Sequence, residues 1–88
     1  MLDEAWVLNG SVALRPEPFG ALAYDFTTRR LSFLKDPALV EVVRALGEHA
    51  TVTETFDAVG IAPADRPRFG AALERLAGQQ MIVRRDAA

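Results

Sequence analysis

The hydrophobic period of this chain changes at Asp36-Pro37. Before this dipeptide, apolar residues alternate with small or polar ones in short runs, which is typical of β-strands with one buried face. After it, apolar residues recur at spacings of three and four, which is typical of amphipathic helices. Asp36 is a favourable N-cap and Pro37 suits the first helical position, so the dipeptide itself predicts a helix start. The sequence therefore predicts an α+β fold whose strands come before its helices.

Three strands are expected before Asp36, and together they predict an antiparallel meander with two edge strands. The first is "SVALR", and the "PEPFG" that follows has the prolines and glycine of a turn. In the second, "ALAYDF", we expect Asp25 to face solvent and the alternate set to face the core: Leu22, Tyr24 and Phe26. After the turn "TTR", the run "RLSFL" is the third strand, with Leu31 and Phe33 expected on its core face.

Three helices are expected after Asp36. The first carries an apolar stripe from Leu39 to Leu46, and the second opens at the capping box 51–54 and stops at Gly60. The last begins around 63–67, and its predicted buried face contains Phe69, Ala72, Leu73, Leu76 and Gln80. Phe56 and Phe69 are expected to be core residues because each is in phase with aliphatic neighbours.

The two ends of the chain are less clearly patterned. "MIVRR" predicts a short terminal strand or an extension, so the expected order is βββααα with a final strand left open. Residues 1–8 precede the first clear strand. Their pattern leaves open whether Trp6 packs against the sheet or belongs to a loose arm.

Composition argues against most kinds of catalytic site. The chain has no cysteine, which excludes disulfides, thiol catalysis and Cys-ligated metals. Its one histidine, His49, lies in a polar loop where a solvated side chain is expected, and no phosphate loop or nucleophile motif is present. We therefore expect no enzyme activity and no cofactor.

Length and hydropathy predict the number of domains and the cellular location. Eighty-eight residues are enough for one domain, 1–88, with one modest core. No apolar run approaches the roughly 20 residues of a membrane span. The first residues lack the basic and apolar regions of a signal peptide. A cytoplasmic protein without membrane contact is expected.

The distribution of charge points to a partner. The net charge is −2, which argues against nucleic acid, yet residues 26–35 carry Arg29, Arg30 and Lys35 without an acid. The last predicted helix also bears arginines, including Arg68 and Arg75 on one flank. If the third strand and this helix lie side by side, they form a basic groove with an unpaired strand edge on one wall. That geometry suits β-augmentation by an extended acidic peptide.

The run "SVALRPEPFGALAYDFTTRRLSFLKDPALVEVVRAL" (residues 11–46) resembles the PqqD-like peptide chaperones, or RiPP precursor-recognition elements, and in particular their mycofactocin-system member. "LERLAGQQMIV" (residues 73–83) is similar to the family's closing helix and strand. The resemblance implies a winged-helix-like fold and no catalysis. It also implies capture of the acidic leader of a ribosomally synthesised precursor peptide, and presentation of that leader to a radical SAM maturase.

The resemblance also implies where the leader binds. It would add as a strand beside the third strand, along a docking edge made of Arg30, Leu31, Ser32, Phe33 and Leu34. Helical phase suggests the opposite wall: Arg68, Ala72 and Arg75.

The sequence also leaves two other functions open. A winged-helix DNA-binding protein would place the last helix in the major groove, with Arg66, Arg68 and Arg75 on phosphates. The acidic balance and the strands that precede the helices argue against it. A plain interaction domain would instead pair its edge strand with a second copy. The expected state is a monomer or a weak homodimer.

Overall fold

A computed structural model describes residues 1–85, so the last three residues of the expected 1–88 domain lie outside the described part. The fold is α+β, with a three-stranded antiparallel sheet and three helices, as predicted. Two short 3-10 turns, η1 and η2, and two further strands complete it. The elements in chain order are β1 (Trp6–Leu8), β2 (Val12–Glu17), β3 (Gly20–Asp25), β4 (Leu31–Leu34), α1 (Pro37–Ala45), η1 (Leu46–Glu48), α2 (Val52–Val59), η2 (Pro63–Asp65), α3 (Arg66–Gly78) and β5 (Ile82–Arg84).

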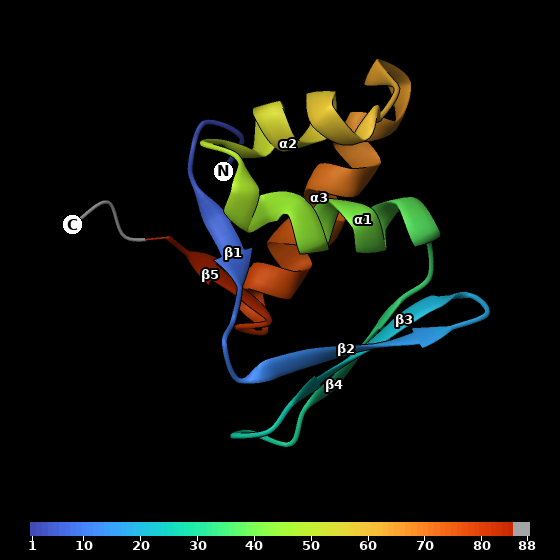
Figure 1. Ribbon diagram of the computed structural model, residues 1–88, viewed down its shortest axis with the longest axis vertical. Coiled ribbons are helices and arrows are strands. Elements are labelled where there is room, and N and C mark those ends of the chain that lie inside the picture. Colours follow the sequence, from blue (N-terminus) through green and yellow to red (C-terminus); the bar gives the residue numbers. More distant parts are fainter. Residues whose placement is uncertain (86–88) are drawn as a thin grey trace.

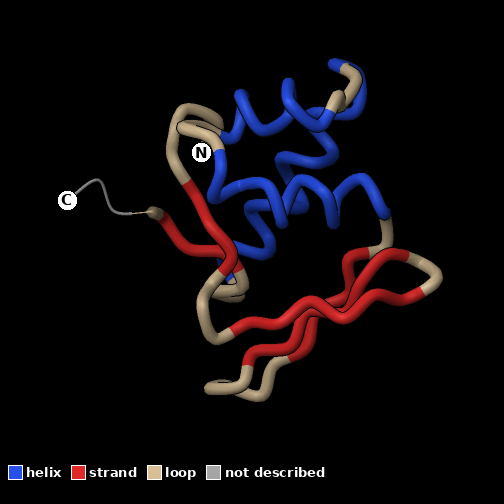
Figure 2. The backbone as a smooth tube through the Cα atoms, viewed as in Figure 1, coloured by secondary structure: helices blue, strands red, loops and turns tan. Residues whose placement is uncertain are grey.

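The strands form two separate sheets. The larger has the order β2-β3-β4, with both connections antiparallel, and the smaller pairs β1 with β5. The helices all lie on one side of the larger sheet (Figure 1). The opposite face of that sheet is not covered by any element of the described chain, as the backbone trace also shows (Figure 2).

The N-terminal segment is a strand and not a loose arm. Trp6 pairs opposite Arg84 in the β1–β5 ladder, and its indole Nε1 donates a hydrogen bond to Glu4 Oε1 at 3.2 Å. Upstream, the Leu2 carbonyl accepts from the Thr53 amide at the start of α2. The final strand that the sequence left open is therefore present, and the first residues of the chain pair with it.

The helix starts follow the predicted capping chemistry. Asp36 Oδ1 accepts from the Ala38 amide at 2.9 Å, and Thr51 Oγ1 accepts from the Glu54 amide at 3.1 Å. Each cap satisfies an amide that has no partner within its helix. The predicted end of the last helix is slightly too long, because α3 ends at Gly78 and Gln80 follows it with a φ of 63°.

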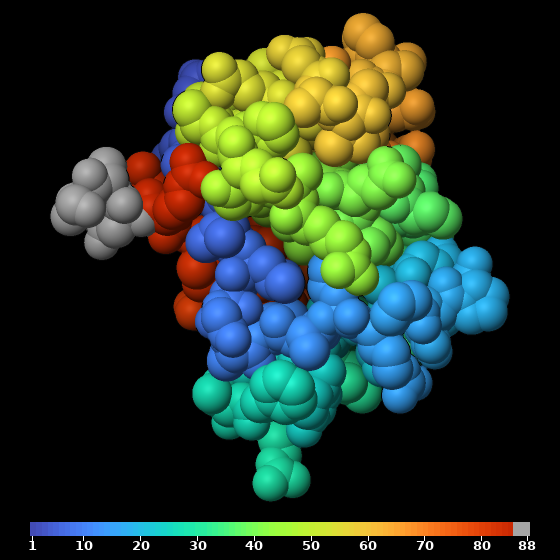
Figure 3. Space-filling model, in the orientation of Figure 1, coloured from blue at the N-terminus to red at the C-terminus, as the bar shows by residue number. Residues whose placement is uncertain are grey.

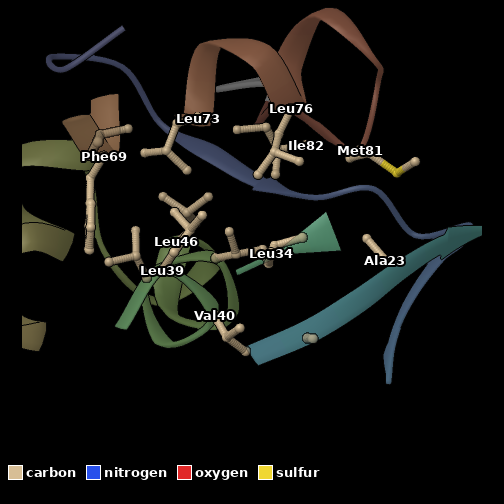
Figure 4. Packing of buried hydrophobic residues seen from close by; sticks show 14 of the residues in the cluster. Ala23, Leu34, Leu39, Val40, Leu46, Phe69, Leu73, Leu76, Met81 and Ile82 are labelled. Carbon is tan, nitrogen blue, oxygen red and sulfur yellow. The ribbon is translucent and has the colours of Figure 1, made fainter. Parts of the chain in front are cut away.

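One hydrophobic core lies between the larger sheet and the helices (Figure 4). Phe56 and Phe69 are buried in it, which confirms their predicted role. The stripe of α3 contributes Leu73 and Leu76, and Ile82 of β5 packs against them (Figure 4).

The predicted orientation of β3 and β4 is wrong. Phe26 is 62% exposed, Leu31 54% and Phe33 53%, whereas the alternate set of the two strands is buried: Ala21, Ala23, Asp25, Ser32 and Leu34. α1 packs on the buried face. A small alanine side chain lets a helix approach a strand closely, so the alanine set faces the helices and the bulky set faces outward.

Within residues 1–85, no helix is long and apolar enough to cross a membrane. The same part of the chain contains no group of three or more histidine, aspartate or glutamate side chains placed to hold a metal ion.

Candidate functional site: the edge of β4 and the facing helix

A groove of about 680 Å³ lies between β4 and α3. The third strand of the predicted meander and the last helix are therefore neighbours, which was the condition for the basic groove. The side chains that line it come from β4, the start of α1 and α3: Leu31, Ser32, Phe33, Lys35, Asp36, Leu39, Arg68, Ala71, Ala72, Arg75 and Gln79.

The structure brings most of the predicted site residues together at this groove. From the docking edge, Leu31, Ser32 and Phe33 line it, and from α3 so do the three predicted positions: Arg68, Ala72 and Arg75. Two predicted residues do not line it. Leu34 points into the core with 1% of its surface exposed, and Arg30 is an exposed residue of the β3–β4 turn.

Sequence reasoning missed several lining residues, and two of them carried a usable signal. Gln79 continues the helical phase of Arg68, Ala72 and Arg75. Lys35 was noted for its charge but was not placed in the site, although it continues the alternation of β4, two residues after Phe33. Ala71 and Leu39 carried no signal that separated them from ordinary core or surface positions.

Within residues 1–85, β4 pairs along one edge only, and its register shows which main-chain groups the other edge offers. The Asp25 amide donates to the Arg30 carbonyl, so this cross-strand pair is hydrogen-bonded. In an antiparallel ladder every second pair is of this kind, so the main-chain groups of Ser32 and Leu34 point toward β3. Those of Leu31 and Phe33 consequently point toward the open edge. Two amides and two carbonyls are available there for an added strand.

The other edge of the sheet is less suitable. By the same alternation, the outward main-chain groups of β2 belong to Val12, Leu14 and Pro16. The Val12 amide already donates to the Asn9 carbonyl at 2.9 Å, and Pro16 has no amide hydrogen. A proline in this position blunts a strand edge. Of the two edges, β4 is the one that can accept a full set of strand hydrogen bonds.

The cations of the groove differ in how far they are already paired. Arg68 Nη1 lies 3.2 Å from Asp36 Oδ2, its Nη2 lies 3.5 Å from Asp65 Oδ1, and its guanidinium stacks 4.6 Å from the Phe69 ring centroid. Arg75 and Lys35 form no ion pair with any residue of the described chain. An incoming carboxylate would therefore meet its least committed partners at Arg75 and Lys35.

An unpaired acceptor also lies at the groove. Gln79 Oε1 is buried and has no hydrogen-bond partner among residues 1–85. Buried polar atoms are usually paired, because an unpaired one loses its hydration without compensation. A donor on a segment bound in the groove would satisfy it.

The turn that leads into β4 is held by a buried carboxylate. Asp25 was expected to face solvent, and that expectation is wrong. Its Oδ1 accepts hydrogen bonds from the Thr27 hydroxyl at 2.7 Å, the Thr27 amide at 2.9 Å and the Ser11 hydroxyl at 3.0 Å. These bonds, the Thr27 hydroxyl first, lower the pKa of Asp25 from 3.8 to about 2.

This network sets the position of the two turn arginines. With the turn anchored inward at Asp25, Arg29 adopts a left-handed φ of 63°, and Arg29 and Arg30 are both exposed. The β3–β4 turn protrudes from the body of the molecule in the space-filling view (Figure 3).

A second pocket, of about 640 Å³, lies between the N-terminus, α2 and the first half of α3. Its walls are mostly apolar and include Leu2, Phe56, Pro63 and Pro67. It lacks an open strand edge, so it does not offer the recognition chemistry of the β4 groove.

Comparison with known proteins gives a consistent result. The family described as "Peptide chaperone MftB family" matches residues 5–83. The protein named "Peptide chaperone MftB" from Mycobacterium ulcerans is 45% identical over 85 residues, which cover 97% of this chain and 78% of that protein. Its namesakes from Mycobacterium tuberculosis and Mycolicibacterium smegmatis are 42% and 44% identical over 96% and 92% of this chain, covering 77% and 79% of those proteins. No solved structure matches significantly.

Proposed function

This chain belongs to the peptide chaperone MftB family. From that premise we propose that it captures the acidic leader of a precursor peptide as a strand added to β4. We propose further that it presents this leader to a radical SAM maturase in mycofactocin biosynthesis. In this role the protein performs no chemistry and needs no cofactor. The fold that carries the role is winged-helix-like, and the complex forms in the cytoplasm.

The observation that carries the proposal is the free edge of β4 facing α3. Leu31 and Phe33 turn unpaired main-chain groups toward a groove that also contains the uncommitted cation Arg75. Backbone hydrogen bonds along such an edge give affinity for any extended segment, and the neighbouring side chains select which segment binds.

Magnitudes are consistent with reversible capture. Four strand hydrogen bonds at about 0.5–1.5 kcal/mol each give a few kcal/mol, and burial of apolar leader side chains adds to them. Ordering a disordered leader opposes both contributions. Contacts between arginine and carboxylate groups at the rim chiefly raise the association rate and favour acidic partners. We therefore expect micromolar or tighter binding that weakens as salt rises.

The DNA-binding alternative is weakened by the pairing of the α3 arginines. Arg66 donates to Asp57 Oδ1 at 2.8 Å and to the Ile61 carbonyl at 3.0 Å, and Arg68 is held by Asp36 and Asp65. Two of the three cations that would contact phosphates are thus neutralised within the chain.

The test is an NMR titration of the labelled protein with a synthetic peptide that has the acidic leader sequence of a mycofactocin precursor. We expect amide shifts concentrated at Leu31, Phe33 and the facing turn of α3, with little change along β2. Two leaders N-methylated at alternate sets of amides test the strand geometry directly. One set should abolish binding and the other should leave it within about threefold, because only alternate amides of an added strand face β4.

The variant Arg30→Glu with Arg75→Glu should lose most of the affinity while its thermal melt stays unchanged. The matched control is Arg44→Glu, a reversal at an exposed position of α1 outside the groove. Equal binding by the double variant and the wild type, or equal binding of both N-methylated leaders, would contradict capture at β4.

A further inference from the structure

The face of the β2-β3-β4 sheet that points away from the helices is apolar. The ladder places Leu22 opposite Phe33 and Tyr24 opposite Leu31 on this face. Phe19 packs edge-on against Phe33 with ring centroids 5.9 Å apart, and Phe26 packs on Tyr24 at 5.1 Å. We name this surface the outer apolar face: Phe19, Leu22, Tyr24, Phe26, Leu31 and Phe33.

The exposed apolar side chains are concentrated here and are not scattered over the molecule. Among residues 1–85, five large hydrophobic side chains are exposed, and four of them belong to the outer apolar face: Phe19, Phe26, Leu31 and Phe33. Single exposed apolar residues are ordinary, but a contiguous patch on a single-layer sheet marks an interaction surface. Aromatic residues are also the type most enriched at binding hot spots.

The rim of the outer apolar face is cationic. Arg15 lies opposite Leu22 in the ladder, so it points to the same side, and Lys35 follows β4 in the outward phase. Arg29 and Arg30 are exposed at the adjoining turn. Of the nearby acids, Asp25 is turned inward and Glu17 pairs with Arg15 at 3.5 Å, so within the described chain Arg29, Arg30 and Lys35 are left without an acidic partner.

This charge pattern argues against a second copy as the occupant. A symmetric dimer through this face would bring the cationic rims of two copies together without acids to match them, which is unfavourable. The pattern suits a different protein whose docking patch is apolar and rimmed by carboxylates.

The outer apolar face is continuous with the groove between β4 and α3, which we name the leader groove. Leu31 and Phe33 belong to both surfaces, because they line the groove and stand on the outward side of β4. A leader added beside β4 would widen the sheet by one strand and turn alternate side chains onto the same outward surface. A partner on this face would thus contact the chaperone and its bound peptide together.

We propose that the outer apolar face is the docking surface for the enzyme that modifies the peptide, and that this enzyme presents an apolar patch with an acidic rim. The identity of the partner as the maturase rests on the proposed function. The surface extends beyond the leader groove, since Phe19 and Phe26 do not line that groove.

The test uses the full chain and the purified radical SAM maturase from the same genome, with binding measured by biolayer interferometry with and without the leader. The test variant is Phe19→Ser with Phe26→Ser, and a second variant is Arg15→Glu with Arg29→Glu. The matched control is Leu2→Ser, which removes an exposed large apolar side chain (47%) elsewhere on the molecule. Circular dichroism melts establish that each variant is folded.

We expect the aromatic variant to bind the maturase at least tenfold more weakly and to bind the leader within twofold of wild type. The charge variant should associate more slowly and lose most of its salt dependence. Leu2→Ser should behave as wild type. Each of these results supports the proposal.

Three results would overturn it: unchanged maturase binding by the aromatic variant, no maturase binding by the wild type, or a wild-type dimer in sedimentation that the aromatic variant dissociates. The last would assign the face to a second copy. Failure of the leader titration alone would instead contradict the proposed function, so the two failures are distinguishable.

Discussion

Arg68 Nη1 lies 3.2 Å from Asp36 Oδ2, so one ion pair joins the start of α1 to α3 at the leader groove. The other oxygen of Asp36 caps α1 by accepting from the Ala38 amide. A leader carboxylate that approaches Arg68 must therefore compete with Asp36 and Asp65, whereas at Arg75 it meets no such competitor in the described chain.

This difference predicts unequal roles for the two arginines. Arg75→Ala should weaken binding of an acidic leader about tenfold, whereas Arg68→Ala should change it by less than about threefold. Loss of the exposed Arg68 pairs should cost at most about 1 kcal/mol of stability. Isothermal titration at two salt concentrations measures the affinities, and urea unfolding measures the stabilities. A larger effect on affinity at Arg68 than at Arg75 would contradict this ranking.

The Asp25 network predicts a specific acid sensitivity. The pKa of Asp25 is about 2 in the folded chain against an ordinary 3.8, so the unfolded chain takes up this proton more readily. Its contribution to stability is present above the ordinary value and is lost as the pH falls from about 4 toward 2. Urea unfolding between pH 6 and pH 2 should show this loss in the wild type. Asp25→Asn should be less stable at pH 6 and should depend less on pH in that window.

The first residue of β3, Gly20, is predicted to tolerate no other side chain. It has a φ of 147°, and a Cβ at this position would collide with the Leu34 carbonyl oxygen. Because the colliding atom is backbone, Gly20→Ala should destabilise the fold by about 1–3 kcal/mol. Gly70→Ala is the control, since it lies within α3 and a Cβ there meets nothing within 4 Å. That change should be neutral or stabilising by up to about 1 kcal/mol. Equal unfolding free energies for the two variants would contradict the predicted clash of an alanine side chain at position 20.

The β1–β5 pairing predicts that the first eight residues are needed for stability. Trp6, Val7 and Leu8 are each half-buried, and a fully buried side chain of this kind contributes about 1.5–3 kcal/mol. Deletion of residues 1–8 should therefore lower the free energy of unfolding by at least about 2 kcal/mol. Hydrogen exchange should also show loss of protection at Val83. Unchanged stability of the truncated chain would mean that the segment behaves as an arm.

Local sequence determined the order and the ends of most elements. Asp36-Pro37 and the Thr51 capping box act through hydrogen bonds within a few residues of themselves, so their effect does not depend on the rest of the fold. The stripe of α3 was likewise readable, because helical periodicity places Phe69, Leu73 and Leu76 on one face. The sequence did not show whether β4 lies beside α3, although the predicted basic groove depended on this placement. In the folded chain the two elements line one groove.

What tertiary structure alone decided is which side of the sheet is buried. An alternating strand has two faces, and its period does not say which of them a helix will cover. Hydrophobicity favoured the set with Tyr24, Phe26 and Phe33, but α1 packs on the side of Ala21 and Ala23. Close packing of a helix on a strand depends on side-chain volume across the interface, which is a property of two elements together and cannot be read from either alone. The same choice turned Asp25 inward and left an aromatic surface facing solvent.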